Sequence, residues 1–143
     1  MTHDDDAPFR DDAACERILD GVLARDLPKA EWTHHAHCVY AAALLMHLTL
    51  AEAEEAAPRH IRLYNERCGV QNTASSGYHH GLTLLYLRSI ADALAGQTGP
   101  ISDRVALILA SPISEKRFPL SIYAEDALFT PSARLFGLAN QGA

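Results

Sequence analysis

The chain has 143 residues, of which 48% are hydrophobic, and its formal net charge is −6. A chain of this length and composition can bury a sizeable core, so we expect one folded domain and exclude general disorder. Lysines and arginines form no basic stripe, which argues against nucleic acid as a partner. The longest apolar run, Val39 to Met46, is too short to span a membrane.

The chain begins with an acidic stretch. Residues 1–10 contain Asp4, Asp5 and Asp6 ahead of Pro8 and are predicted to form a disordered leader. An acidic start lacks the cationic region of a secretory signal, and the three widely spaced cysteines fit neither a disulfide framework nor a zinc ribbon. The sequence therefore predicts a cytoplasmic protein with a single helical domain over residues 11–143.

Apolar residues recur at helical spacing along most of the remaining chain. Helices are predicted over about residues 11–25, 33–50, 51–68, 78–95 and 100–111. The second is apolar nearly all round and is expected at the centre of the domain. Pro58 should break the third helix or begin a new one. Three later prolines predict short helices joined by turns, so the expected fold is all-α: a compact single-domain bundle of about five main helices plus short C-terminal helical turns.

Six of the eight histidines lie on the two most apolar predicted helices, at positions 34, 35, 37, 47, 79 and 80. His34 and His37 are three residues apart and project from one helix face, whereas His35 should point elsewhere. His79, at the start of another apolar helix, could supply a third imidazole. Three imidazoles and a water match the open coordination of catalytic zinc, and copper, nickel or iron would accept the same ligands. The pattern predicts a divalent-metal site, zinc first, made by His34, His37 and His79; the alternative is a partly exposed polar face without metal.

Other chemistry-bearing side chains lie in or near these motifs. The candidates for proton transfer at the site are His80, Tyr78 and Tyr123. Arg134 could bind a substrate carboxylate or phosphate, although stabilising the carbonyls of a helix end is the preferred interpretation. A nucleophilic dyad of Cys38 with His79 is a weaker alternative, since the adjacent His37 points away from Cys38 on a helix.

Three motifs follow one another over about residues 30–136: Trp32-x-His34-x-x-His37, then Gly77-Tyr78-His79-x-x-x-Thr83, then Tyr123-x-x-Asp126-x-Leu128-Phe129-Thr130-x-x-Ala133-Arg134. In this order they resemble a family of small bacterial all-helical proteins of unknown function. The resemblance implies that His34, His37 and His79 are the functional positions. Where that family carries glutamate and threonine, this chain has His80 and Gly81, so the resemblance implies altered chemistry or metal preference if the glutamate acts there.

Two classes of function are compatible with these patterns. The first is a metal-dependent enzyme, a hydrolase or an oxygenase, that acts on a small-molecule substrate at the three-histidine site. The second is a non-catalytic protein that is stabilised by a metal or binds a partner, in which the histidines contribute packing, capping and pH sensitivity. A homodimer is compatible with either class. Three protein ligands beside an accessible pocket would favour catalysis, and four would favour a structural metal.

Overall fold

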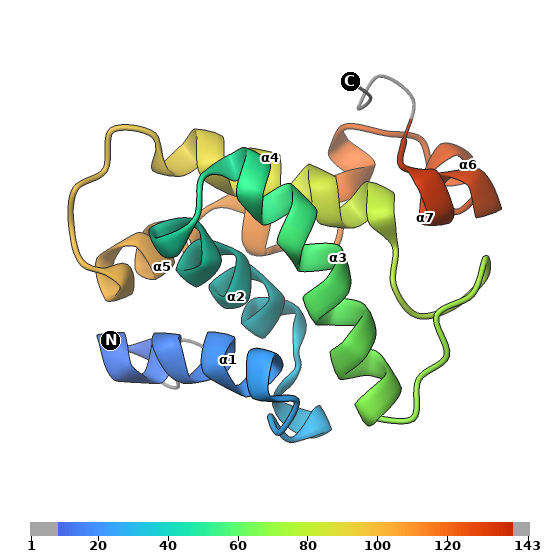
Figure 1. The fold of residues 1–143 in the computed structure, drawn as a ribbon. Coiled ribbons are helices and arrows are strands. Elements are labelled where there is room, and N and C mark those ends of the chain that lie inside the picture. Colours follow the sequence, from blue (N-terminus) through green and yellow to red (C-terminus); the bar gives the residue numbers. More distant parts are fainter. Residues whose placement is uncertain (1–8, 139–143) are drawn as a thin grey trace.

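The computed structural model describes residues 9–138, and every regular element in that range is helical (Figure 1). The main helices are α1 (Asp12–Ala24), α2 (His34–His47), α3 (Leu50–Arg67), α4 (His80–Leu94) and α5 (Ile101–Leu109). The shorter ones are η2 (Lys29–Glu31), η3 (Pro112–Ser114), η4 (Phe118–Ser121), α6 (Glu125–Leu128) and α7 (Pro131–Phe136). The predicted all-α bundle of five main helices with short C-terminal turns is confirmed. Within the described range, no helix combines the length and the apolar character that crossing a membrane requires.

Most of the leader predicted over residues 1–10 lies outside the described residues. Its last two residues are described, and Phe9 is buried in the main core. The Phe9 carbonyl accepts a hydrogen bond from the Cys15 thiol (3.4 Å). Core packing therefore begins at Phe9, ahead of the domain start expected at residue 11.

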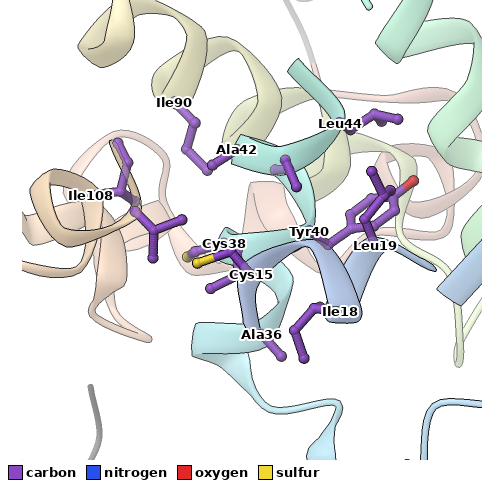
Figure 2. Close-up of a cluster of buried hydrophobic side chains, with 14 of the residues drawn as sticks. Cys15, Ile18, Leu19, Ala36, Cys38, Tyr40, Ala42, Leu44, Ile90 and Ile108 are labelled. Carbon is purple, nitrogen blue, oxygen red and sulfur yellow. The ribbon is translucent and has the colours of Figure 1, made fainter. Parts of the chain in front are cut away.

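Helix α2 lies at the centre of the bundle, where α1, α3, α4 and α5 all contact it (Figure 1). Thr33 caps its N-terminus by accepting a hydrogen bond from the Ala36 N–H (3.2 Å). Small buried side chains along the helix let its neighbours approach closely: Ala36, Ala41, Ala42 and Ala43. Figure 2 shows this layer, with Cys15 of α1, Cys38 of α2 and Ile108 of α5 among its members. The central position that the sequence predicted is observed.

Helix α3 runs without interruption through Pro58, so the predicted break or new helix start at this proline is wrong. A capping box fixes the start of the helix ahead of the proline. The Thr49 hydroxyl accepts a hydrogen bond from the Glu52 N–H (3.2 Å), and the Glu52 carboxylate accepts one from the Thr49 N–H (2.9 Å). Ala57 and Tyr64 are buried against the bundle on either side of the proline, and this packing offsets the missing backbone donor.

The chain after α5 forms a C-terminal segment, residues 112–138, which covers the N-terminal end of α4 (Figure 1). Helix α7 packs directly on that end, and the apolar cluster beneath it is separate from the main core. Gly81 allows this close approach, because a Cβ at position 81 would lie 2.8 Å from Leu138 Cγ. A larger side chain at position 81 would therefore require Leu138 to move.

Arg134 of α7 ties the C-terminal segment to the turn ahead of α4. Its Nη1 donates a hydrogen bond to the Gly77 carbonyl (2.9 Å). Neither role proposed for Arg134 from the sequence describes this contact, because the carbonyl belongs to another element. Positions 77 and 134 are far apart in the sequence, so no local pattern predicts this hydrogen bond.

Tyr64 joins α3 to the segment that follows α1. Its ring is buried, and its hydroxyl donates to the Leu27 carbonyl (2.8 Å). Tyr64→Phe keeps the ring but leaves the carbonyl without its donor, so we expect the free energy of unfolding to fall by about 1–2 kcal/mol. Urea denaturation measures the change. Tyr123→Phe is the control: the Tyr123 hydroxyl has no hydrogen bond within residues 9–138, and stability should change by under about 0.5 kcal/mol. Equal losses in the two variants would contradict this assignment.

Candidate functional site

The predicted histidines surround one pocket between α2, α3, α4 and the C-terminal segment. Its volume is about 540 Å³, within the range of small-molecule sites. Aromatic and aliphatic side chains make up most of the wall: Trp32, Tyr40, Tyr78, Tyr86, Phe129, Ile61, Val70, Leu82, Leu87, Pro119, Leu120 and Leu128. Among the described residues no Asp or Glu side chain lines it, and Lys116 is the one permanently charged side chain on its wall. The pocket is therefore suited to a largely apolar, non-cationic molecule.

His34 begins α2 and lines this pocket. Its Nε2 is buried without a hydrogen-bond partner among the described residues. Burial lowers the pKa of His34, and the backbone of Ile113 in η3 opposes this in part. The lowered pKa favours the neutral imidazole, in which a ring nitrogen accepts or donates a hydrogen bond according to the tautomer.

His37 lies one turn further along α2 on the same face. Many protein atoms lie around His37, but the surface of its ring is exposed to the pocket. The Trp32 ring packs against it edge-on, with centroids 3.9 Å apart and planes at 66°. Burial, and secondarily the neighbouring His34, lower the pKa of His37 to about 4. No hydrogen bond to the ring is present within the described range, so both nitrogens of a neutral imidazole are available to a ligand.

The other two histidines of α2 do not line this pocket. His35 lines a second surface pocket beside Arg17 and Ser114, and His34 borders that pocket too. His47 lies at the far end of the helix, where its Nε2 is 3.2 Å from a carboxylate oxygen of Glu16.

His79 lines the pocket as well, but both of its ring nitrogens have protein partners. Nδ1 accepts a hydrogen bond from the Leu82 N–H (3.0 Å), which makes His79 the N-cap of α4. Nε2–H donates to the Leu128 carbonyl of α6 (2.6 Å). Since one partner only donates and the other only accepts, the tautomer is fixed as Nε2–H. His79 links α4 to the C-terminal segment, a role that the sequence did not reveal.

The three predicted metal ligands share a pocket but do not form a ligand set in this conformation. Within residues 9–138, no three His, Cys, Asp or Glu side chains are grouped so that they could hold one metal ion. His79 would have to release the hydrogen bond from the Leu82 N–H, and with it the N-cap of α4, to offer the Nδ1 lone pair to a metal. His34 Nε2 has no such partner to release within the described range. The metal site therefore stays a prediction, with two of its three histidines available.

Of the three candidates for proton transfer, one lines the pocket and two do not. Tyr78 lines the pocket, and burial raises the pKa of its hydroxyl to about 12. His80 lies outside the pocket wall, with Nδ1 2.8 Å from the Tyr78 hydroxyl. Tyr123 packs on the small cluster under the C-terminal segment, away from the pocket. Tyr78 is the one of the three that can meet a ligand directly.

The nucleophilic dyad of Cys38 with His79 is not formed. The Cys38 thiol is buried in the main core, 4.0 Å from the Ile113 carbonyl, and burial raises its pKa to about 12. A thiol in that state is not a nucleophile at neutral pH. The nitrogens of His79 meanwhile contact Leu82 and Leu128.

Sequence reasoning missed the residues that build the pocket from loops. Asn72 accepts hydrogen bonds from the Tyr78 N–H and from Asn65 (both 3.0 Å) and donates to the Arg62 carbonyl (3.1 Å), which fixes the loop between α3 and α4. Lys116 reaches the pocket from the turn after η3. Neither residue belongs to a periodic pattern. An asparagine within a polar loop was the single local signal, since its side chain often bonds to nearby backbone.

Comparison with protein-family models, with curated proteins and with solved structures gave no match in any of the three cases. The resemblance to an uncharacterised bacterial family therefore stays a prediction, and function has to be inferred from the pocket itself.

Proposed function

We propose that the protein binds a small, largely apolar molecule in the central pocket and that His34 and His37 contact its polar group. One observation carries the proposal: His34 lines an apolar pocket, and its buried Nε2 has no hydrogen-bond partner in the described range. Buried polar atoms are nearly always hydrogen-bonded, so a free one beside a pocket suggests a ligand. Apolar pockets with a few convergent polar groups are typical of ligand-binding and active sites.

A fragment screen tests this proposal. Fragment-sized compounds, each with an apolar body and one polar group, would be added to the full chain carrying ¹⁵N-labelled histidine. We expect compounds that bind to shift the ring resonances of His34 and His37 and to leave that of His47 unchanged. His37→Ala should weaken binding about tenfold, the size expected for losing one buried hydrogen bond.

The matched control is His47→Ala, which removes an imidazole from the far end of α2, where His47 lines a different pocket that neither His34 nor His37 borders. It should leave the affinity unchanged. The proposal fails if no compound binds, or if compounds bind without shifting either His34 or His37.

A divalent metal is the second candidate, supported by the shared pocket of His34 and His37. Imidazole nitrogens without a protein partner suit zinc, copper and nickel, and His34 Nε2 is such a nitrogen. Metal analysis of untagged protein, followed by the same analysis of His34→Ala and His37→Ala, tests it. We expect both variants to lose metal, and His79→Ala to retain it if His79 keeps its structural role. Absence of metal from the wild-type protein after incubation with Zn²⁺ would exclude this candidate.

A further inference from the structure

The wall of the central pocket has its permanent charge at the exposed rim and apolar surface in its interior. Lys116 is exposed, as are the wall residues Leu120 and Phe129. Leu87 and Leu128 of the same wall are almost fully buried. A molecule in the pocket therefore meets the ammonium group where the pocket opens to solvent, and meets uncharged side chains further in.

No carboxylate among the described residues neutralises Lys116. Its ammonium group has no ion pair within that part of the chain. Lys116 also lines the second pocket beside His35, where Glu31 is the one carboxylate on the described wall. Both oxygens of Glu31 are already bonded to the guanidinium of Arg17. The positive charge of Lys116 is therefore available to a bound anion.

His37 adds a hydrogen-bond donor to the same pocket. Its ring surface is exposed there, and its nitrogens have no hydrogen bond within the described range. A neutral imidazole carries one N–H in either tautomer, so it can donate to an anionic oxygen whichever nitrogen is protonated. Lys116 lies on the histidine side of the pocket: burial is the main cause of the lowered pKa of His34, and the Lys116 charge adds to it.

We infer that the ligand is a monocarboxylate with an apolar body, whose carboxylate pairs with Lys116 and accepts a hydrogen bond from His37; this inference rests on the proposed function. A carboxylate is ionised at neutral pH and only accepts hydrogen bonds, which matches an ammonium group and an imidazole N–H. The aromatic and aliphatic wall surrounds the body of the molecule.

Other polar groups match these charges less well. An ammonium group would face Lys116 as a like charge and would find no Asp or Glu on the described wall. A phosphate monoester carries up to two negative charges, but Lys116 is the one permanent positive charge there, and an unpaired charge beside apolar surface is costly. A primary amide has the shape of a carboxylate without its charge and is therefore the closest competitor.

A set of matched ligands tests the inference on the unmodified full chain. The probes are 2-naphthoate, the isosteric neutral 2-naphthamide, and 2-naphthyl phosphate. We expect 2-naphthoate to bind about five- to tenfold more tightly than the amide by titration calorimetry, because an ion pair beside an apolar wall is less screened than one in open solvent. We also expect 2-naphthoate to shift the ring resonances of ¹⁵N-labelled His37 and to leave those of His47 unchanged.

A pair of charge variants tests the role of Lys116. Lys116→Gln should bring the affinity for 2-naphthoate to within about twofold of that for the amide, since the ion pair is lost. The control is Arg117→Gln, which removes the same charge from the next residue, outside the pocket wall. Both residues are exposed, so both variants should fold, and Arg117→Gln should retain the preference for the carboxylate.

Equal affinities of the wild-type protein for 2-naphthoate and 2-naphthamide would overturn the inference and leave the proposed function standing. Tighter binding of 2-naphthyl phosphate than of 2-naphthoate would overturn it in favour of a phosphate ester. A preference for the carboxylate that survives in Lys116→Gln, or that is lost equally in Arg117→Gln, would also overturn it. If none of the three compounds binds, the inference fails, and the fragment screen decides the proposed function separately.

Discussion

His79→Ala should lower the free energy of unfolding by about 2–4 kcal/mol and loosen the C-terminal segment. Two interactions are lost together. The first is the N-cap of α4, where the ring accepts from the Leu82 N–H, worth about 1 kcal/mol. The second is the hydrogen bond to the buried Leu128 carbonyl, whose loss leaves an unsatisfied acceptor at a cost of about 1–3 kcal/mol. Urea denaturation measures the total loss in the free energy of unfolding. Amide hydrogen exchange over residues 125–138 shows whether the C-terminal segment is the part that is destabilised.

His79→Asn separates the two interactions. Asparagine is a good N-cap, but its shorter side chain should not reach the Leu128 carbonyl. We expect it to recover about 1 kcal/mol relative to His79→Ala, while exchange in α6 and α7 stays fast. A loss confined to α4, with unchanged exchange in the C-terminal segment, would contradict the role assigned to His79.

Acidification should destabilise the protein well before its carboxylates are protonated. Five described histidines have pKa values below the ordinary 6.5, in each case mainly because burial disfavours the charged ring: His34, His37, His60, His79 and His80. A lowered pKa in the folded state means that the unfolded chain binds protons more readily. Stability is therefore complete above about pH 6.5 and is lost as the pH falls from there toward the folded-state values. The carboxyls whose pKa is lowered, such as Glu31 and Glu52, lose their contribution only below 4.5.

The number of protons taken up on unfolding sets how steeply the free energy of unfolding falls with pH. We expect at least about one proton, that of His37, to be taken up near pH 5.5, and each proton lowers the free energy of unfolding by about 1.4 kcal/mol per pH unit. Urea denaturation at pH 7.5, 6.5 and 5.5 yields the slope, and His37→Gln should reduce it by up to about one proton. A free energy of unfolding that stays constant between pH 7.5 and 5.5 would falsify the prediction.

Helical periodicity predicted those parts of the site that depend on one helix. The shared face of His34 and His37, the different direction of His35, and the central place of α2 all follow from 3.6 residues per turn. These relations need no knowledge of any other element. The spacing of residues along a single helix is therefore sufficient to predict these relations.

Interactions between distant segments could not be predicted in the same way. His79 and Leu128 are 49 residues apart, and a histidine before a helix does not reveal which carbonyl it will meet. Ile113, whose backbone partly opposes the lowering of the His34 pKa, lies in a short 3₁₀ helix that carries no periodic signal. Pro58 was misread for a related reason, since tertiary packing of α3 outweighs the local preference of proline.

The residues that line the pocket lie far apart in the sequence, and this matters during synthesis on the ribosome. Wall residues extend from Trp32 to Phe129, so the pocket cannot close until Phe129 has emerged. At translation rates of about 5–20 residues per second, the 49 residues between His79 and Leu128 take roughly 3–10 s to make. During that interval the apolar side chains of α2 and α4 that will line the pocket face solvent without their cover. The nascent chain therefore exposes these side chains for a defined period, during which aggregation competes with folding.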